Sequence, residues 1–164
     1  MKTKRQFLTA FAILLGSSLL LQSCSSKKGS AKGMVARMEV KEPIEGVCDN
    51  NNVLVLMSFM DAKQIEAKSP VSQEKVAEKI QATSVFLKNN PDFNGKGVVS
   101  CIINCNGELV QVSMSNASES TELDEEVMAV FREQKQWTPG TYYGTPVDNV
   151  QLISFEVENG VISI

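Results

Sequence analysis

Residues 97–140 read GVVSCIINCNGELVQVSMSNASESTELDEEVMAVFREQKQWTPG. Two runs rich in β-branched and apolar residues, at 98–103 and 109–114, flank the dipeptide Asn106-Gly107. Asn-Gly tolerates the positive φ angles of a tight hairpin turn, so this arrangement is a strong local signal for two paired strands. The stretch therefore predicts a β-hairpin that turns at Gly107.

A helix is predicted directly after this hairpin, over residues 123–135. Leu123, Val127 and Phe131 share one helical face, while acidic residues stand in the first turn and basic residues in the last, as the helix dipole favours. The segment runs into Trp137-Thr138-Pro139-Gly140, where proline and glycine end the helix. Strand, turn, strand, helix and a Trp-x-Pro-Gly stop thus follow one another.

The chain begins with a basic segment and a short apolar stretch, residues 7–21, which together are typical of a secretory signal. This stretch is shorter than the roughly 20 residues of a membrane-spanning helix. The residues before Cys24 resemble a bacterial lipobox, so we expect residues 1–23 to be a lipoprotein signal peptide and Cys24 to carry the lipid anchor. An ordinary signal peptide cut nearby is the alternative. Residues 24–33 are small, polar and basic, which predicts a flexible tether.

Composition argues against several functions. Removing residues 1–23 takes away three of the 16 Lys and Arg and none of the 19 Asp and Glu, which leaves a formal charge of −6. An acidic domain offers no electrostatic attraction to nucleic acid. The chain has no histidine, and we interpret Asp124, Glu125 and Glu126 as a solvated helix start rather than a catalytic cluster. We therefore predict no enzyme activity, no metal site and no cofactor.

Residues 34–70 are predicted to form an N-terminal β-hairpin extension. Strand-like runs at 35–40 and 52–59 enclose turn residues between them. A helix is then expected from Ser72, its N-cap, to about Lys88. Residues 71–164 are expected to form the main domain, and the 141 residues that follow residue 23 suffice for one hydrophobic core but hardly for two.

Three cysteines remain beyond Cys24. Cys101 and Cys105 are four positions apart in one predicted strand, so their Cα atoms would lie about 13 Å apart, too far for a disulfide. Cys48 could pair with either of them in an oxidising compartment. We interpret Cys101 as a small buried core residue and keep a Cys48–Cys105 bridge as a hypothesis.

The last predicted strand, residues 147–157, places Phe155 and Val157 on one face. A second Asn-Gly, at 159–160, predicts that the chain turns back on itself. We hypothesise that residues 161–164 protect a strand edge from unwanted pairing.

The ordered set of motifs resembles the C-terminal domain of the TonB family over residues 75–157. The matching parts are Val99 to Ile103, Asn106-Gly107, Leu109 to Met114, Leu123-Asp124, Trp137-Thr138-Pro139-Gly140, Gly144-Thr145-Pro146-Val147 and Ile153-Ser154-Phe155. The resemblance implies an α+β fold, with an antiparallel three-stranded meander, two helices on one face and the added hairpin. It assigns structural roles to Gly107, Trp137, Pro139, Gly140 and Phe155.

The resemblance also implies a periplasmic protein-binding module that pairs the edge of its last strand with an extended transporter segment. The candidate partner-binding residues are Tyr142, Tyr143, Val150 and Leu152. We expect a lipid-anchored, periplasm-facing protein of the outer rather than the inner membrane, whose partner is an outer-membrane transporter or a second copy. Because the family's inner-membrane helix and Pro-rich spacer are not seen, we do not expect energy transduction by this chain alone. The alternatives are a structural, self-associating envelope lipoprotein, or a modulator that competes for the transporter's peptide.

Overall fold

The computed structural model describes residues 35–164, which belong to one compact unit. The signal peptide, the lipid anchor on Cys24 and the tether that the sequence predicts lie outside the described residues. Within residues 35–164, no helix combines the length and the hydropathy needed to span a bilayer.

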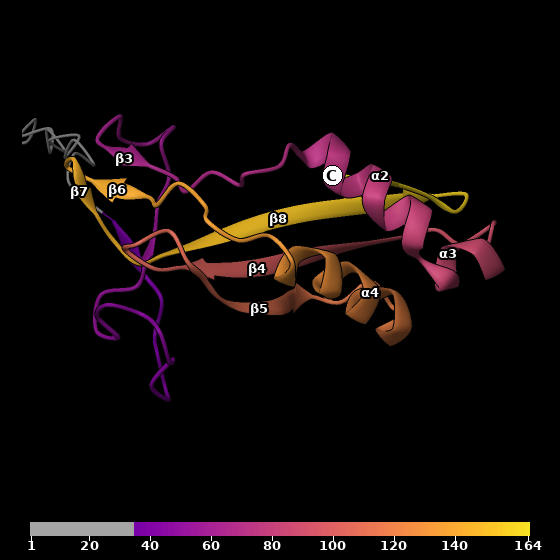
Figure 1. Cartoon of the computed structure of the whole chain (residues 1–164), viewed down its shortest axis with the longest axis horizontal. Coiled ribbons are helices and arrows are strands. Elements are labelled where there is room, and N and C mark those ends of the chain that lie inside the picture. The colour runs from indigo at the N-terminus through magenta and orange to yellow at the C-terminus, as the bar shows by residue number, and fades with distance from the viewer. Residues whose placement is uncertain (1–34) are drawn as a thin grey trace, which may run out of the picture. The chain divides into compact units, whose positions relative to one another are not determined.

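Three long strands form the centre of the main sheet: β4 (Gly95–Ile103), β5 (Leu109–Asn116) and β8 (Asn149–Glu158). They lie side by side with β4 in the middle, antiparallel to both neighbours (Figure 1). The α+β class is confirmed, but the predicted meander is wrong. In a meander β8 would flank β5, whereas here the chain after β5 crosses the sheet through α4 (Thr121–Arg132) and returns along the far side of β4.

The described helices are three rather than the two predicted. The continuous helix expected from Ser72 to Lys88 is divided into α2 (Gln73–Thr83) and α3 (Val85–Asn89). Ser84 interrupts it with an extended backbone and uses its side chain as the N-cap of α3. The carboxylate of Glu126 in α4 accepts the Val85 N–H and so satisfies a second group at the start of α3. The break is therefore made by a contact from another helix.

All three helices pack on one face of the main sheet and form the main core with it. The alternation of side chains along a strand puts every second residue of β4 and β8 on this face. The buried core residues of these elements are Val76, Ala77, Ile80, Leu87, Val99, Cys101, Ile103, Leu123, Val127, Val130, Phe131, Ile153, Phe155 and Val157. Each fully buried aliphatic or aromatic side chain contributes about 1.5–3 kcal/mol, so this face supplies most of the stability.

The N-terminal segment covers one end of the opposite face. β1 (Ala36–Arg37) and β2 (Leu54–Val55) pair antiparallel as the hairpin prediction requires, but each has only two residues. β2 also pairs with the start of β8 in parallel. Val53 packs there against Ile102 and Val150 in a second, smaller cluster.

A small sheet of β3 (Gln64–Ile65), β6 (Thr141–Tyr142) and β7 (Thr145–Pro146) stands at the opposite end of β8 from α2 and α3 (Figure 1). The chain ends in β9 (Val161–Ser163), which pairs with the last residues of β8. Its turn has positive φ angles at Asn159 and Gly160, as the Asn-Gly signal predicts.

Candidate functional site

The motif residues of the hairpin turn and the Trp-x-Pro-Gly segment are brought together by packing. Gly107 has a φ of +83°, and a Cβ added there would lie 2.2 Å from the carbonyl oxygen of Trp137. The Trp137 N–H donates to the Gly107 oxygen at 2.8 Å, and its indole is buried. An added Cβ on Gly140 would meet the side chain of Asn149 at 2.7 Å, while Pro139 is half-buried. These residues therefore join the β4–β5 turn to the segment after α4.

Cys48 and Cys105 form a disulfide with a Cα–Cα distance of 6.1 Å. Beside it, the buried carboxylate of Asp148 accepts backbone N–H groups from Cys48 and Cys105, both at 3.0 Å, and from Asp49 at 2.7 Å. The two sulfurs and this carboxylate lie within 4.8 Å of one another, but sulfurs joined in a disulfide are not thiolate ligands. The group therefore anchors the N-terminal segment to the β4–β5 turn.

Cys101 keeps a free thiol in the core, as predicted. Burial raises the pKa of this thiol to about 12. A thiol that remains protonated and enclosed at neutral pH is a packing group rather than a nucleophile.

The four predicted partner-binding residues do not form one surface. Tyr142 ends β6 of the small sheet and Tyr143 lies in the turn after it, with ring centroids 4.8 Å apart and the Lys63 ammonium 4.4 Å from the Tyr143 ring centroid. Val150 is buried beneath the N-terminal segment. Leu152, with half of its surface exposed, is the residue of the four that lies on an open stretch of β8.

This open stretch is the middle of the outer side of β8. Hydrogen-bonding groups alternate in direction along a strand. The carbonyl of Asp148 accepts the Leu54 N–H on the side where β2 lies, and Glu158 pairs with β9 on the same side. The backbone N–H and C=O groups of the even-numbered residues of β8 therefore point to this outer edge. Between β2 and β9, no strand of residues 35–164 pairs there with β8. Leu152 and Ser154 consequently present their N–H and C=O groups to an edge of five residues, 151–155, about 17 Å long.

The open stretch ends after residue 155, because the C-terminal tail pairs with the residues of β8 that follow it. The Gln81 side chain in α2 donates to the Gly160 oxygen at 3.0 Å and accepts the Ile162 N–H at 2.9 Å, while the Ile162 side chain is buried. α2 thereby closes the outer edge of β9. The prediction that residues 161–164 protect an edge applies to the last three residues of β8, and the protection stops before Phe155.

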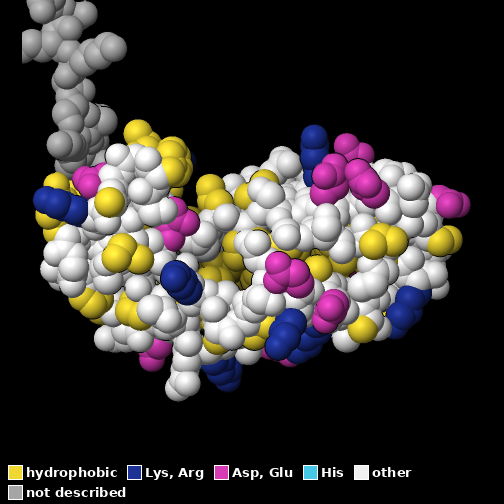
Figure 2. All heavy atoms as spheres, turned by 90° about the horizontal axis from the view of Figure 1, so that it is seen from above, with side chains coloured by type: hydrophobic (Ala, Val, Ile, Leu, Met, Phe, Trp, Pro, Cys, Tyr) yellow, Lys and Arg dark blue, Asp and Glu magenta, His cyan; other side chains and the backbone are white. Residues whose placement is uncertain are grey.

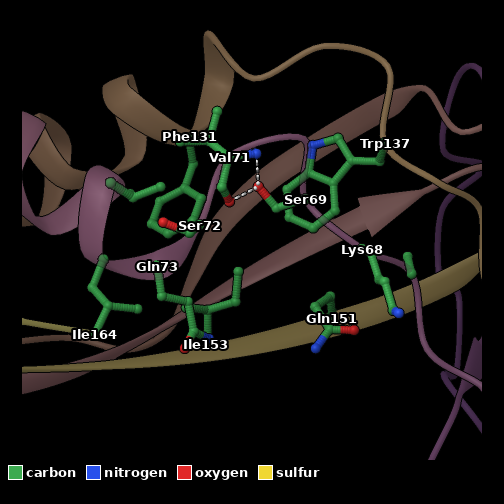
Figure 3. Close-up of a pocket in the computed structure, with 12 residues that line it drawn as sticks. Lys68, Ser69, Val71, Ser72, Gln73, Phe131, Trp137, Gln151, Ile153 and Ile164 are labelled. Atoms are coloured by element: carbon green, nitrogen blue, oxygen red, sulfur yellow. Dashed lines mark hydrogen bonds between the residues drawn. The ribbon is translucent and has the colours of Figure 1, made fainter.

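A pocket of about 240 Å³ opens beside the unpaired stretch of β8. Figure 2 looks onto the molecule from this side and shows hydrophobic side chains in a hollow of the surface. In Figure 3, Gln151 and Ile153 of β8 form one side of the pocket, and Phe131 and Trp137 lie across from them. The pocket has no local signal in the sequence, because its walls come from five separate segments.

The polar groups around the pocket are few. The Ser69 hydroxyl accepts the Val71 N–H at 3.0 Å and lies 2.7 Å from Gln134 Oε1, so its hydrogen bonds are made within the protein. Lys68 is the charged side chain among the lining residues, and none of them is a histidine, cysteine or carboxylate side chain. This set of groups suits binding of an apolar group better than acid–base or nucleophilic chemistry.

The candidate site is thus a short open strand edge with an apolar pocket at its side. Comparison of the chain with models of known families, with curated proteins and with solved structures finds no match.

Proposed function

We propose that this chain is a lipid-anchored protein of the cell envelope that binds a protein partner by strand addition to β8. The observation that carries the proposal is the unpaired stretch 151–155, where Leu152 and Ser154 offer backbone donors and acceptors. An extended segment of a partner is the natural complement of such an edge. The five open residues limit the added strand to about five residues.

The sequence supplies two further supports. The order of motifs resembles the TonB C-terminal domain, which implies binding of an extended transporter segment by the last strand. The lipobox-like residues before Cys24 imply an anchor that faces the periplasm, and we place it in the outer membrane. In this proposal the partner is an outer-membrane transporter, and the chain binds it without catalysis.

The experiment compares two proline substitutions in a pull-down from solubilised membranes. Leu152→Pro removes an outward N–H from β8 and keeps the bonds to β4, because the Leu152 N–H faces the open side. Val112→Pro is the matched control, since its N–H faces outward from β5 at the other edge of the sheet. We expect the unaltered chain and V112P to recover an outer-membrane transporter and L152P to lose it. Equal recovery by all three would contradict strand addition to β8.

A second candidate function is self-association in the envelope. The small sheet and the turn before it expose large apolar side chains, with Phe59 at 83% and Met60, Ile65 and Tyr143 each at about half of their surface. Exposed apolar side chains of this kind are typical of protein contacts. Replacement of Phe59 and Ile65 by serine should then abolish an oligomer of the purified protein, measured by sedimentation, while transporter recovery is unchanged.

A further inference from the structure

We propose that the pocket beside β8 receives one large apolar side chain from the added strand, so that the partner segment is selected by its central residue. This inference rests on the proposed strand addition and specifies the class of segment that fits. It concerns the peptide residue directly opposite Ile153.

The register of β8 fixes where that side chain points. Directly opposite residues on neighbouring strands direct their side chains to the same face. Ile153 points to the helix face, where it lines the pocket with Gln151 (Figure 3). A partner residue opposite Ile153 therefore directs its side chain to the pocket, and the residues before and after it face the other side of the sheet.

The size of the pocket suits a side chain. Its volume of about 240 Å³ lies below the range of about 300–1,000 Å³ of pockets that hold whole small ligands. Phe131, Trp137 and Val76 form apolar walls and are themselves buried. A carboxylate placed among them would lose its hydration, and Lys68, the one lining side chain of opposite charge, is exposed to solvent, so the ion pair would contribute little.

The other face of the sheet determines which side chains fit best in the partner residues before and after the one opposite Ile153. One of them would lie opposite Leu152, whose side chain is half exposed there, and the other opposite Ser154, which is also exposed. Cross-strand contact with a leucine favours β-branched neighbours. The segment that fits best is thus extended and reads β-branched, large apolar, β-branched.

The test uses the full chain in detergent and peptides of the form Ser-Thr-Val-Xaa-Val-Thr-Ser, where Xaa is Leu, Phe, Ala or Asp. Trp137 lines the pocket and is the one tryptophan of the chain, so its fluorescence reports occupancy directly. We expect the Leu and Phe peptides to bind at least about tenfold more tightly than the Ala peptide and to shift the Trp137 emission. The Asp peptide should bind no better than the Ala peptide. Equal affinity across the series would overturn the pocket assignment.

Two protein variants provide the matched control. Val71→Phe narrows the pocket at its rim, and Val85→Phe makes the same change at an exposed position outside it. V71F should bind the Leu and Ala peptides with about equal affinity, whereas V85F should still prefer the Leu peptide. An unchanged preference in V71F would also overturn the assignment.

N-methylation of the peptide separates this inference from the proposed function. Because bonding groups alternate along a strand, methylation of one alternating set of peptide nitrogens should abolish binding and methylation of the other should not. Alternation without a preference at Xaa would leave strand addition standing and reject the pocket. Loss of the alternation, or failure of all the peptides to bind, would reject both.

Discussion

The ring of Phe155 lies directly over Gly97, its register partner in the neighbouring strand. A Cβ added to Gly97 would come within 2.6 Å of the Phe155 Cζ atom, so glycine is required for this aromatic ring to lie flat against β4.

Gly97→Ala should lower the free energy of unfolding by about 1–3 kcal/mol, because overpacking outweighs the gain of less than 1 kcal/mol from replacing a flexible glycine. Chemical denaturation measures the change. In G97A/F155L the smaller side chain leaves room for the methyl group, so the double variant should lose less than the sum of the two single variants. Strict additivity would show that the clash is relieved elsewhere.

The disulfide should stabilise the fold substantially. Cys48 and Cys105 are 57 positions apart, and cross-links of this span typically contribute about 2–4 kcal/mol. C48S/C105S should therefore unfold at a lower denaturant concentration than the unaltered chain. A reductant should reproduce the loss in the unaltered chain and leave the double variant unchanged. An unaltered chain indifferent to the reductant would refute the prediction.

Gln81 should hold the C-terminal tail. Gln81→Leu removes its hydrogen bonds to Gly160 and Ile162 at nearly constant size and should cost about 1–3 kcal/mol. The amide of Ile162 should then exchange faster with solvent deuterium. Glu78→Leu, on an exposed part of the same helix, is the control and should leave that amide protected. Similar exchange in both variants would assign the tail's stability to the Ile162 side chain alone.

The buried thiol predicts a loss of stability in alkali. Because burial raises the pKa of Cys101 to about 12, the folded chain keeps this proton while the unfolded chain releases it above pH 9. The unfolded state is therefore favoured as pH rises from about 9 to 12, by up to about 1.4 kcal/mol per pH unit. Unfolding curves at pH 8 and 10 should diverge between the unaltered chain and Cys101→Val, with the variant less sensitive. The same pH dependence of unfolding in the unaltered chain and in C101V would show that the Cys101 thiol is not the cause of the loss.

Local sequence signals located the hairpin at Gly107, the helix that begins near Leu123 and the turn at Asn159-Gly160. Each of these features is determined by residues that are close together in the sequence, so it can be predicted from the sequence alone. The break of the first helix at Ser84 was missed because Glu126, 42 positions away, supplies part of the cap. The pairing of β8 with β4 was missed for a related reason, since strand order is decided by long-range packing.

The candidate site shows the same division. The last strand predicts both Leu152 and Val150 as binding residues, but Val150 is covered by residues that pack from the N-terminal segment. Asp148 carries no sequence signal, since a single aspartate before a strand is common. Its role appears only when three backbone N–H groups from two loops converge on it.

The bridge between Cys48 and Cys105 also determines how the protein carries mechanical load. If the chain is pulled between a lipid anchor at its N-terminus and a partner on β8, the force passes from Cys48 to Cys105 through a covalent bond. Residues 49–104 lie outside this path and cannot be stretched, which removes about 200 Å of contour length from the extensible chain. Tension therefore reaches β5 and the strands beyond it without first unravelling α2, α3 or β4.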